Sequence, residues 1–174
     1  MEKLLDSKTV YEGRMINLRV DSIELPSGRQ TTREIVEHTD SVVIVPVDSS
    51  GNVLLVRQYR TAIGQALLEV PAGKTEPDEH PLQCAHRELR EETGHDAEIM
   101  EDMGGFYAGP GYSTEYLHLY LATDLTPEDG TVDADEIMDV FRVPLGDTPD
   151  MIASGKICDA KSIAGLLRVV YKVK

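Results

Sequence analysis

The sequence predicts an α/β protein in which helices pack on a mixed β-sheet. First, residues 42–47 (VVIVPV) form an uninterrupted apolar run, which is typical of a strand buried on both faces. Second, residues 81–93 and 160–171 carry apolar side chains at helical spacing. Third, strands and helices follow one another along the chain, an order that favours layers of helix around a mixed sheet.

The first 40 residues predict a small β-strand region. Residues 10–38 contain stretches of alternating apolar side chains, and a Pro-Ser-Gly turn at 26–28 separates two extended pieces. Strands this short bury little apolar area by themselves, so docking on a partner is physically reasonable. We therefore expect residues 1–40 to contribute to dimerisation and residues 41–174 to form the main domain.

The main domain begins with the apolar strand 42–47. The turn residues 48–52 join it to a partner strand at 53–59. Further strands are expected at 67–70, 99–107, 116–122 and 138–144, and a short helix from Thr148 to Gly155 precedes the last helix.

The central helix has a clear start and stop. Pro81 suits the first helical position, where its missing N–H costs nothing, and Gly94 suits the left-handed residue after the last turn. At about 100° per residue, Leu82, Ala85 and Leu89 fall on one stripe that is expected to face the core.

Composition excludes several classes of partner. The chain has 174 residues and a formal net charge of −14, which argues against binding to nucleic acid or to an anionic membrane. Cys84 and Cys158 have no metal-ligand spacing and are expected to be thiols rather than a disulfide or a zinc site. No apolar run is long enough to span a bilayer and no signal peptide is evident, so we expect a soluble cytoplasmic protein.

Acidic residues cluster on the central helix. Glu88 and Glu92 are one turn apart beside the apolar stripe, and Glu91 lies further round within reach of the same ion. Several carboxylate oxygens on one rigid face are the ligands that Mg²⁺ or Mn²⁺ prefers, and Arg87 can hold Glu91 by an i,i+4 ion pair. By itself the cluster is more typical of a solvated acidic face than of a metal site.

The spacing around this helix resembles the Nudix hydrolase signature. The signature reads Gly, five residues, Glu, seven residues, Arg-Glu, an aliphatic, any residue, Glu-Glu, any residue, Gly and an aliphatic. These positions are filled by Gly73, Glu79, Arg87, Glu88, Leu89, Glu91, Glu92 and Gly94. Only the last position departs, with His95 in place of an aliphatic residue. The resemblance implies an α/β/α sandwich around a mixed sheet and hydrolysis of a diphosphate linkage.

Other segments resemble the ADP-ribose pyrophosphatase branch of that family. They are the stretch Glu69–Gly73, the strand end Arg57–Arg60, the segment Gly109–Ser113 and Pro110, fifteen residues after His95. The resemblance implies a nucleoside diphosphate sugar as substrate, with ADP-ribose giving AMP and ribose 5-phosphate.

The resemblance also implies a ligand set for Mg²⁺, with Mn²⁺ as a possible substitute. Glu88, Glu91 and Glu92 would bind the metal together with the backbone carbonyl of Ala72. Glu79 would bind indirectly or brace the loop that follows Gly73. We expect Gly73 itself to permit the backbone angles of that loop.

The general base is expected on the loop at 127–137, where this branch carries a glutamate. Glu136 is the first choice because it lies beside the next strand, and Asp133 and Asp135 are the alternatives. A solvated acidic loop with no catalytic member is also compatible with the sequence. Together with Glu91 and Arg87, Glu136 makes up the predicted catalytic set.

Five residues are predicted to bind substrate: Arg57, Arg60, Glu69, Gly109 and Pro110. A very acidic protein needs cations beside an anionic ligand, but the two arginines are equally compatible with surface residues at a strand end. Glu69 either bonds the nucleotide or pairs with one of those arginines. The glycines near residue 109 match no phosphate-binding loop and favour turns.

Two further interpretations stay open. One is a related enzyme that acts on another substrate, such as GDP-mannose or a dinucleotide. The other is a nucleotide-sensing module without catalysis, which the complete set of signature glutamates disfavours. In the resembling family N-terminal strands pack across a two-fold axis, so we expect a homodimer.

Overall fold

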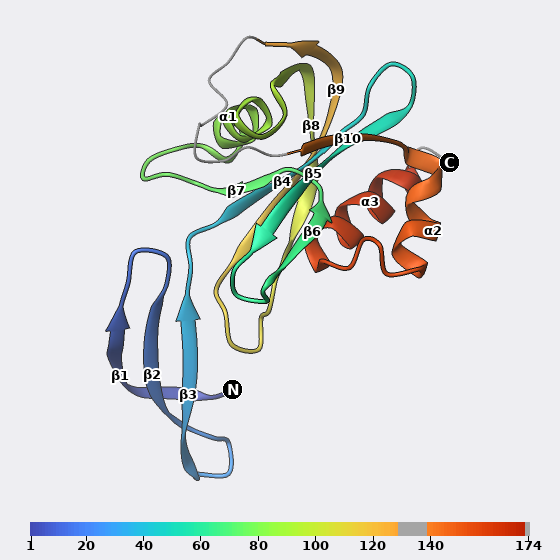
Figure 1. The fold of residues 1–174 in the computed structure, drawn as a ribbon. Coiled ribbons are helices and arrows are strands. Elements are labelled where there is room, and N and C mark those ends of the chain that lie inside the picture. Colours follow the sequence, from blue (N-terminus) through green and yellow to red (C-terminus); the bar gives the residue numbers. More distant parts are fainter. Residues whose placement is uncertain (129–138, 173–174) are drawn as a thin grey trace. The chain divides into compact units, whose positions relative to one another are not determined.

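The computed structural model describes residues 1–128 and 139–172, which divide into two units (Figure 1). The first unit comprises Met1–Asp40 and Tyr107–Tyr116, and the second comprises Ser41–Phe106 and Leu117–Lys174. The distant segment 107–116 belongs with the N-terminal residues.

The first unit is an antiparallel three-stranded sheet. Its strands β1 (Lys3–Glu12), β2 (Asn17–Glu24) and β3 (Gln30–Glu37) lie in that order. In the segment 107–116, the carbonyl of Tyr112 accepts a hydrogen bond from Val36 N (2.7 Å). Every residue of β1 is exposed, so this unit buries little apolar area by itself.

The second unit contains a mixed four-stranded sheet in the order β7-β4-β9-β8. Strand β4 (Ser41–Pro46) runs parallel to β9 (Tyr116–Pro127) and antiparallel to β7 (Ala72–Lys74), and β8 (His95–Tyr107) lies at the edge. Because parallel and antiparallel pairs share one sheet, the prediction of a mixed α/β fold is confirmed.

A second sheet in this unit has the order β10-β5-β6. It consists of β5 (Asn52–Arg60), β6 (Gln65–Glu69) and β10 (Asp139–Pro144), with β5 antiparallel to both neighbours. The helices are α1 (Pro81–Thr93), α2 (Thr148–Ala153) after a 3₁₀ turn at Leu145–Asp147, and α3 (Ala160–Lys172). No helix within residues 1–128 and 139–172 is long and apolar enough to cross a membrane.

Strand β4 is buried on both faces, which explains its uninterrupted apolar sequence. Because side chains alternate along a strand, Ile44 joins a core cluster with Leu89 of α1 and Val45 joins another with Leu166 of α3. The two helices therefore cover opposite faces of this strand, and α1 has a fixed surface from which to present its polar side.

The prediction that Leu82 of α1 faces the core is wrong. Leu82 is 38% exposed, whereas Ala85, Leu89 and the unpredicted Cys84 are fully buried. The buried stripe is centred nearer to Ala85 and Glu92, so Leu82 lies at its edge in the first turn.

Candidate active site

Helix α1 begins and ends at the predicted residues because its backbone ends are capped. The His80 side chain accepts a hydrogen bond from Leu82 N (3.2 Å), and the Gln83 side chain accepts one from His80 N (3.2 Å). At the other end Gly94 adopts φ 67° and donates to the carbonyl of Arg90 (2.9 Å). These caps fix the helix register, and with it the direction of each acidic side chain.

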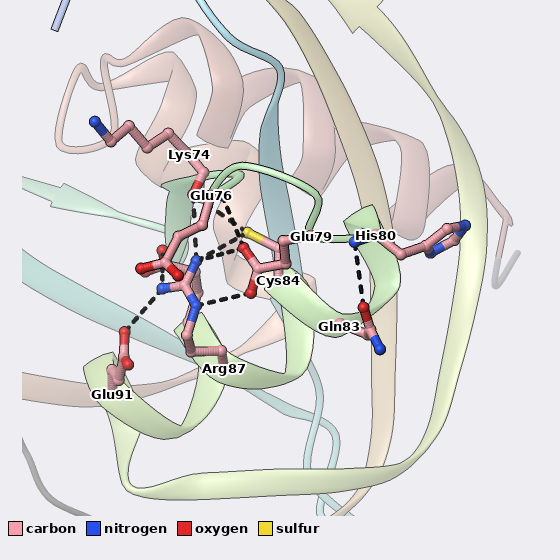
Figure 2. A network of polar contacts seen from close by, with 9 residues as sticks. Lys74, Glu76, Glu79, His80, Gln83, Cys84, Arg87 and Glu91 are labelled. Atoms are coloured by element: carbon pink, nitrogen blue, oxygen red, sulfur yellow. Dashed lines mark hydrogen bonds and ion pairs between the residues drawn. The ribbon is translucent and has the colours of Figure 1, made fainter.

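Arg87 lies at the centre of the acidic cluster (Figure 2). Its guanidinium donates two hydrogen bonds to Glu79, both of 2.9 Å, and one to Oε1 of Glu88 (2.7 Å). A further bond reaches Oε2 of Glu91 (3.0 Å), which confirms the i,i+4 pair expected from the sequence. One cation thus holds three carboxylates.

Glu79 braces the loop between Gly73 and the helix. The Arg87 guanidinium lowers the pKa of Glu79 to about 2, so this carboxylate is ionised at neutral pH. Its Oε2 atom also accepts a hydrogen bond from Glu76 N (3.0 Å), and Arg87 donates to the carbonyl of Lys74 (3.2 Å). Both side chains therefore tie the loop to α1.

Cys84 lies beneath the same loop as a buried, protonated thiol. Burial raises its pKa to about 12, and its Sγ donates to the carbonyl of Lys74 (3.4 Å). Its Sγ also accepts a hydrogen bond from Arg87 Nη2 (3.3 Å), so it adds packing and two weak hydrogen bonds, in agreement with the interpretation as a buried thiol.

Gly73 is needed for a different reason from the one predicted. It lies in β7 and has no left-handed φ, so the expectation that it permits unusual backbone angles is wrong. Instead, a Cβ atom at this position would lie 2.0 Å from Cδ and from Oε1 of Glu88. Glycine leaves the space that the Glu88 carboxylate occupies.

Glu92 is held beside Glu88 by the same strand. It is 7% exposed, and its Oε2 atom accepts a hydrogen bond from Ala72 N (3.1 Å). Ala72 and Gly73 therefore meet two glutamates one helical turn apart. Both contacts depend on the packing of β7 against α1.

The donor types fit a hard divalent cation, although the ligands are not yet gathered around one point. Among residues 1–128 and 139–172, no three Asp, Glu, His or Cys side chains converge as a metal site does. Arg87 occupies one oxygen each of Glu88 and Glu91. With Glu79 and Glu92 the cluster holds four carboxylates and one guanidinium, a formal charge of −3, so added cations are electrostatically favoured.

A second polar cluster surrounds Glu69 at the end of β6. This carboxylate is 1% exposed and receives a forked pair from Arg60, with Nε–Oε1 at 2.9 Å and Nη2–Oε2 at 2.5 Å. Lys161 of α3 also donates to Oε2. Burial alone would raise the pKa of Glu69, but the hydrogen bonds and charges of Arg60 and Lys161 outweigh it and hold that pKa below its usual value.

The other predicted substrate residues lie in different places. Arg57 is exposed on β5, opposite Leu68 in the register with β6. Gly109 belongs to the first unit, where its carbonyl accepts hydrogen bonds from Tyr112 N (3.1 Å) and Ser113 N (2.8 Å), so it forms a turn as the sequence favours. Pro110 lies in the same turn. Glu136, Asp133 and Asp135 fall outside the described residues.

Sequence reasoning missed the contribution of the first turn of α3. Asp159 caps this helix by accepting hydrogen bonds from Lys161 N and Ser162 N, both of 3.2 Å, and it also pairs with Lys161 Nζ (3.0 Å). Ser162 accepts a hydrogen bond from Val70 N (2.9 Å). The aspartate before a helix could have been recognised as a cap. The contacts with β6 had no sequence signal, because they join residues 92 positions apart.

Comparison with known proteins supplies the family. The family model described as NUDIX domain matches residues 37–164, which is most of the chain. The chain belongs to the Nudix family. It is a Nudix hydrolase, and enzymes of this family generally use divalent metal ions. A second model, the nucleoside diphosphate sugar hydrolase N-terminal domain, matches residues 2–36.

Individual relatives cover almost the whole Nudix hydrolase chain. An ADP-ribose pyrophosphatase of Bacillus subtilis is 36% identical over 163 residues, which cover 92% of this chain and 88% of the relative. One from Mycobacterium tuberculosis is 37% identical, with 95% and 81% covered. The crystal structure of an ADP compounds hydrolase aligns with a TM-score of 0.90 at 25% identity, covering 99% of this chain and 94% of that one.

Proposed function

We propose that this Nudix hydrolase cleaves the diphosphate linkage of ADP-ribose, or of a similar nucleoside diphosphate sugar, to give AMP and ribose 5-phosphate. The observation that carries the proposal is the acidic cluster around Arg87, whose formal charge of −3 is built from signature residues. The similarity of the chain to two ADP-ribose pyrophosphatases supports this choice of substrate.

The metal site is proposed at the contact between α1 and β7. Glu88, Glu91 and Glu92 would hold Mg²⁺, or Mn²⁺ in its place, together with the carbonyl oxygen of Ala72. Bound there, the metal would neutralise the phosphates and lower the pKa of a water molecule. The role of Arg87 is to hold Glu88 and Glu91 next to this position before the metal binds, which reduces the reorganisation that ligation requires.

Substrate binding is proposed to use the cations at the end of β5. Arg60 is held by Glu69, and Arg57 is exposed on the same strand, so both can meet an anionic ligand. Gly109 and Pro110 of the first unit also remain proposed substrate-binding residues. Glu136 remains the proposed base, with Asp133 and Asp135 as its alternatives.

We also propose that the first unit forms a homodimer contact. Its strand β1 is exposed along its whole length and carries Leu4, Leu5, Val10 and Tyr11, each at least 42% exposed. A second copy of the chain would cover such side chains. Light scattering at micromolar concentration tests this: a monomer mass would contradict the proposal.

The function is tested by a product assay with Mg²⁺ on wild type, Glu92→Gln and the exposed control Glu98→Gln. Glutamine at position 92 keeps an oxygen for the Ala72 N–H but loses the charge, so it should fold normally. We expect AMP and ribose 5-phosphate from wild type and the control, and a loss of about a thousandfold in kcat/KM for Glu92→Gln.

The substrate panel separates the alternatives. GDP-mannose, UDP-glucose, NADH and a diadenosine polyphosphate are assayed beside ADP-ribose. Faster turnover of one of these would keep the chemistry and reject ADP-ribose as the preferred substrate. Tight binding of a nucleotide with no turnover of any compound would favour the sensing module.

A further inference from the structure

Two ion pairs connect the end of β5 with the start of α3. Arg60 and Glu69 come from neighbouring strands but are not paired in the sheet, because the register places Gln65 opposite Arg60 and Val56 opposite Glu69. Their side chains therefore bridge several residues along the strands. The strand pairing does not bring these two residues together, so the position of the Arg60 guanidinium depends on the position of the Glu69 carboxylate.

Lys161 of α3 binds the same carboxylate. Its Nζ shares Oε2 of Glu69 with Arg60 and also pairs with Asp159 (3.0 Å). The Lys161 side chain is only 15% exposed, so it has little direct access to a ligand in solution. Asp159 is itself anchored as the cap of α3. The start of α3 therefore holds Lys161, Lys161 holds the Glu69 carboxylate, and Glu69 holds the Arg60 guanidinium.

Arg60 has one amino group left for a further ligand. Nε and Nη2 donate to Glu69, and Nη1 makes no hydrogen bond or ion pair within the described part of the chain. The side chain is 38% exposed. The hydrogen bonds with Glu69 are the largest influence that raises the pKa of Arg60. Glu69 lies three residues before Ala72, whose N–H binds Glu92, so the forked pair belongs to the segment that meets the proposed metal ligands.

We propose that Lys161 is a positioning residue for the hydrolysis. By holding Oε2 of Glu69, it keeps the forked pair in one plane and so directs the remaining amino group of Arg60 to an anionic oxygen of the substrate. Lys161 does not touch the substrate in this arrangement. The inference rests on the proposed function, because it assigns Arg60 to the diphosphate substrate of the site beside Glu92.

Three substitutions at one position separate the charge of Lys161 from its packing. Lys161→Met keeps the length without the charge, Lys161→Gln keeps a hydrogen-bond donor without the charge, and Lys161→Arg keeps the charge. The matched control is Lys172→Met, which removes an ion pair with Glu101 at the other end of α3. Kinetics are measured at saturating Mg²⁺ with the substrate that wild type turns over best.

We expect Lys161→Met and Lys161→Gln to raise KM about tenfold while kcat changes less than about twofold, because a ground-state contact to a charged group is loosened. Lys161→Arg should stay within about twofold of wild type, and so should the Lys172→Met control. An unchanged KM in Lys161→Gln, or the same change in Lys172→Met, would overturn the proposal. If Lys161→Met does not fold, Lys161→Gln still decides.

A second readout is independent of activity. The Nε–H of Arg60, assigned in ¹⁵N spectra with Arg60→Lys, should exchange slowly with water in wild type and in Lys172→Met, and faster in Lys161→Met and Lys161→Gln. An identical exchange rate in all four proteins would overturn the positioning role. If wild type hydrolyses no diphosphate, the proposed function fails, and this measurement alone then decides whether Lys161 orders Arg60.

Discussion

The two polar clusters of the second unit have opposite charge balances. Around Arg87, one guanidinium meets Glu79, Glu88 and Glu91, with Glu92 beside them. Around Glu69, one carboxylate meets two cations, and Asp159 completes a group whose formal charges cancel. The first cluster therefore needs further positive charge, whereas the second is electrically complete within the chain.

This difference explains why the two clusters are suited to different tasks. A set of carboxylates with too few cations is strained without a metal and gains from binding one. A network whose charges cancel has no net negative charge to attract a metal ion, but it holds its members in one geometry. Metal binding and orientation of Arg60 are therefore assigned to separate groups, and substitutions should affect the two clusters differently.

The largest effect on stability is expected at Glu69. Glu69→Gln leaves Arg60 without its counter-charge and the largely buried Lys161 with only that of Asp159, so the free energy of unfolding should fall by about 3 kcal/mol at pH 7. Urea denaturation measures the difference. Glu101→Gln, in an exposed pair with Lys172, is the control and should change the free energy by less than about 0.5 kcal/mol.

The same variant has a predicted pH dependence. The folded-state pKa of Glu69 lies below 4.5, so its stabilisation is complete above that value and is lost as pH falls through the lower folded pKa. The difference in unfolding free energy between wild type and Glu69→Gln should narrow below pH 4.5. A difference that stays constant down to pH 3 would contradict the ionised network.

Gly73→Ala should damage the acidic cluster with little loss of stability. The new Cβ would collide with the Glu88 carboxylate, which is the end of a flexible side chain and can swing away. We expect kcat/KM to fall about a hundredfold while the melting temperature changes little, because one ligand of the proposed metal is displaced. Gly146→Ala, at an exposed position with open space around it, is the control and should match wild type in both assays.

Magnesium should distinguish the two clusters by its effect on melting. At ten times its Kd, a metal that binds only the folded protein adds about 1.4 kcal/mol, or roughly 3–6 °C for a chain of this length. Thermal shift assays with Mg²⁺ and with EDTA should show this rise in wild type and Lys161→Met. Glu88→Gln should lose most of it, and an equal rise in Glu88→Gln would reject Glu88 as a ligand.

The smallest effect is expected for a surface ion pair at the far end of α3. Lys172→Met removes the pair with Glu101, in which both side chains are at least 40% exposed, so the unfolding free energy should change by less than about 0.5 kcal/mol. Lys161→Met should cost clearly more in the same denaturation experiment. An equal decrease in unfolding free energy for the two variants would mean that the largely buried ion pair of Lys161 stabilises the protein no more than the exposed pair of Lys172.

Helix α1 shows how much local sequence can predict. Pro81, the cap at Gly94 and the spacing of Ala85 and Leu89 are local signals, and they predicted the helix, its ends and most of its buried face. The i,i+4 pair of Arg87 with Glu91 followed from the same geometry. The buried strand β4 was also predicted, because its signal is an apolar run of consecutive residues.

Contacts between distant segments were not predicted. Why a glycine is needed at position 73 can be seen only once the position of the Glu88 carboxylate is known. The contact of Lys161 with Glu69 likewise depends on the packing of α3 against the end of β6. The short strand β7 has only three residues, too few for an alternating pattern, and its partner β4 is remote in sequence. The association of segment 107–116 with the N-terminal sheet is likewise a pairing across a long separation.

The sequence by itself determined the family of this protein, the bounds of its acidic helix and the number of carboxylates on it. These follow from short-range spacing, because helix geometry fixes where neighbours at i+3 and i+4 lie. Only the tertiary structure decided that Arg87 also holds Glu79 and Glu88, and that Glu69 is neutralised by Arg60 and Lys161. Such contacts depend on how strands and helices pack, and that packing joins residues whose separation along the chain carries no periodic signal.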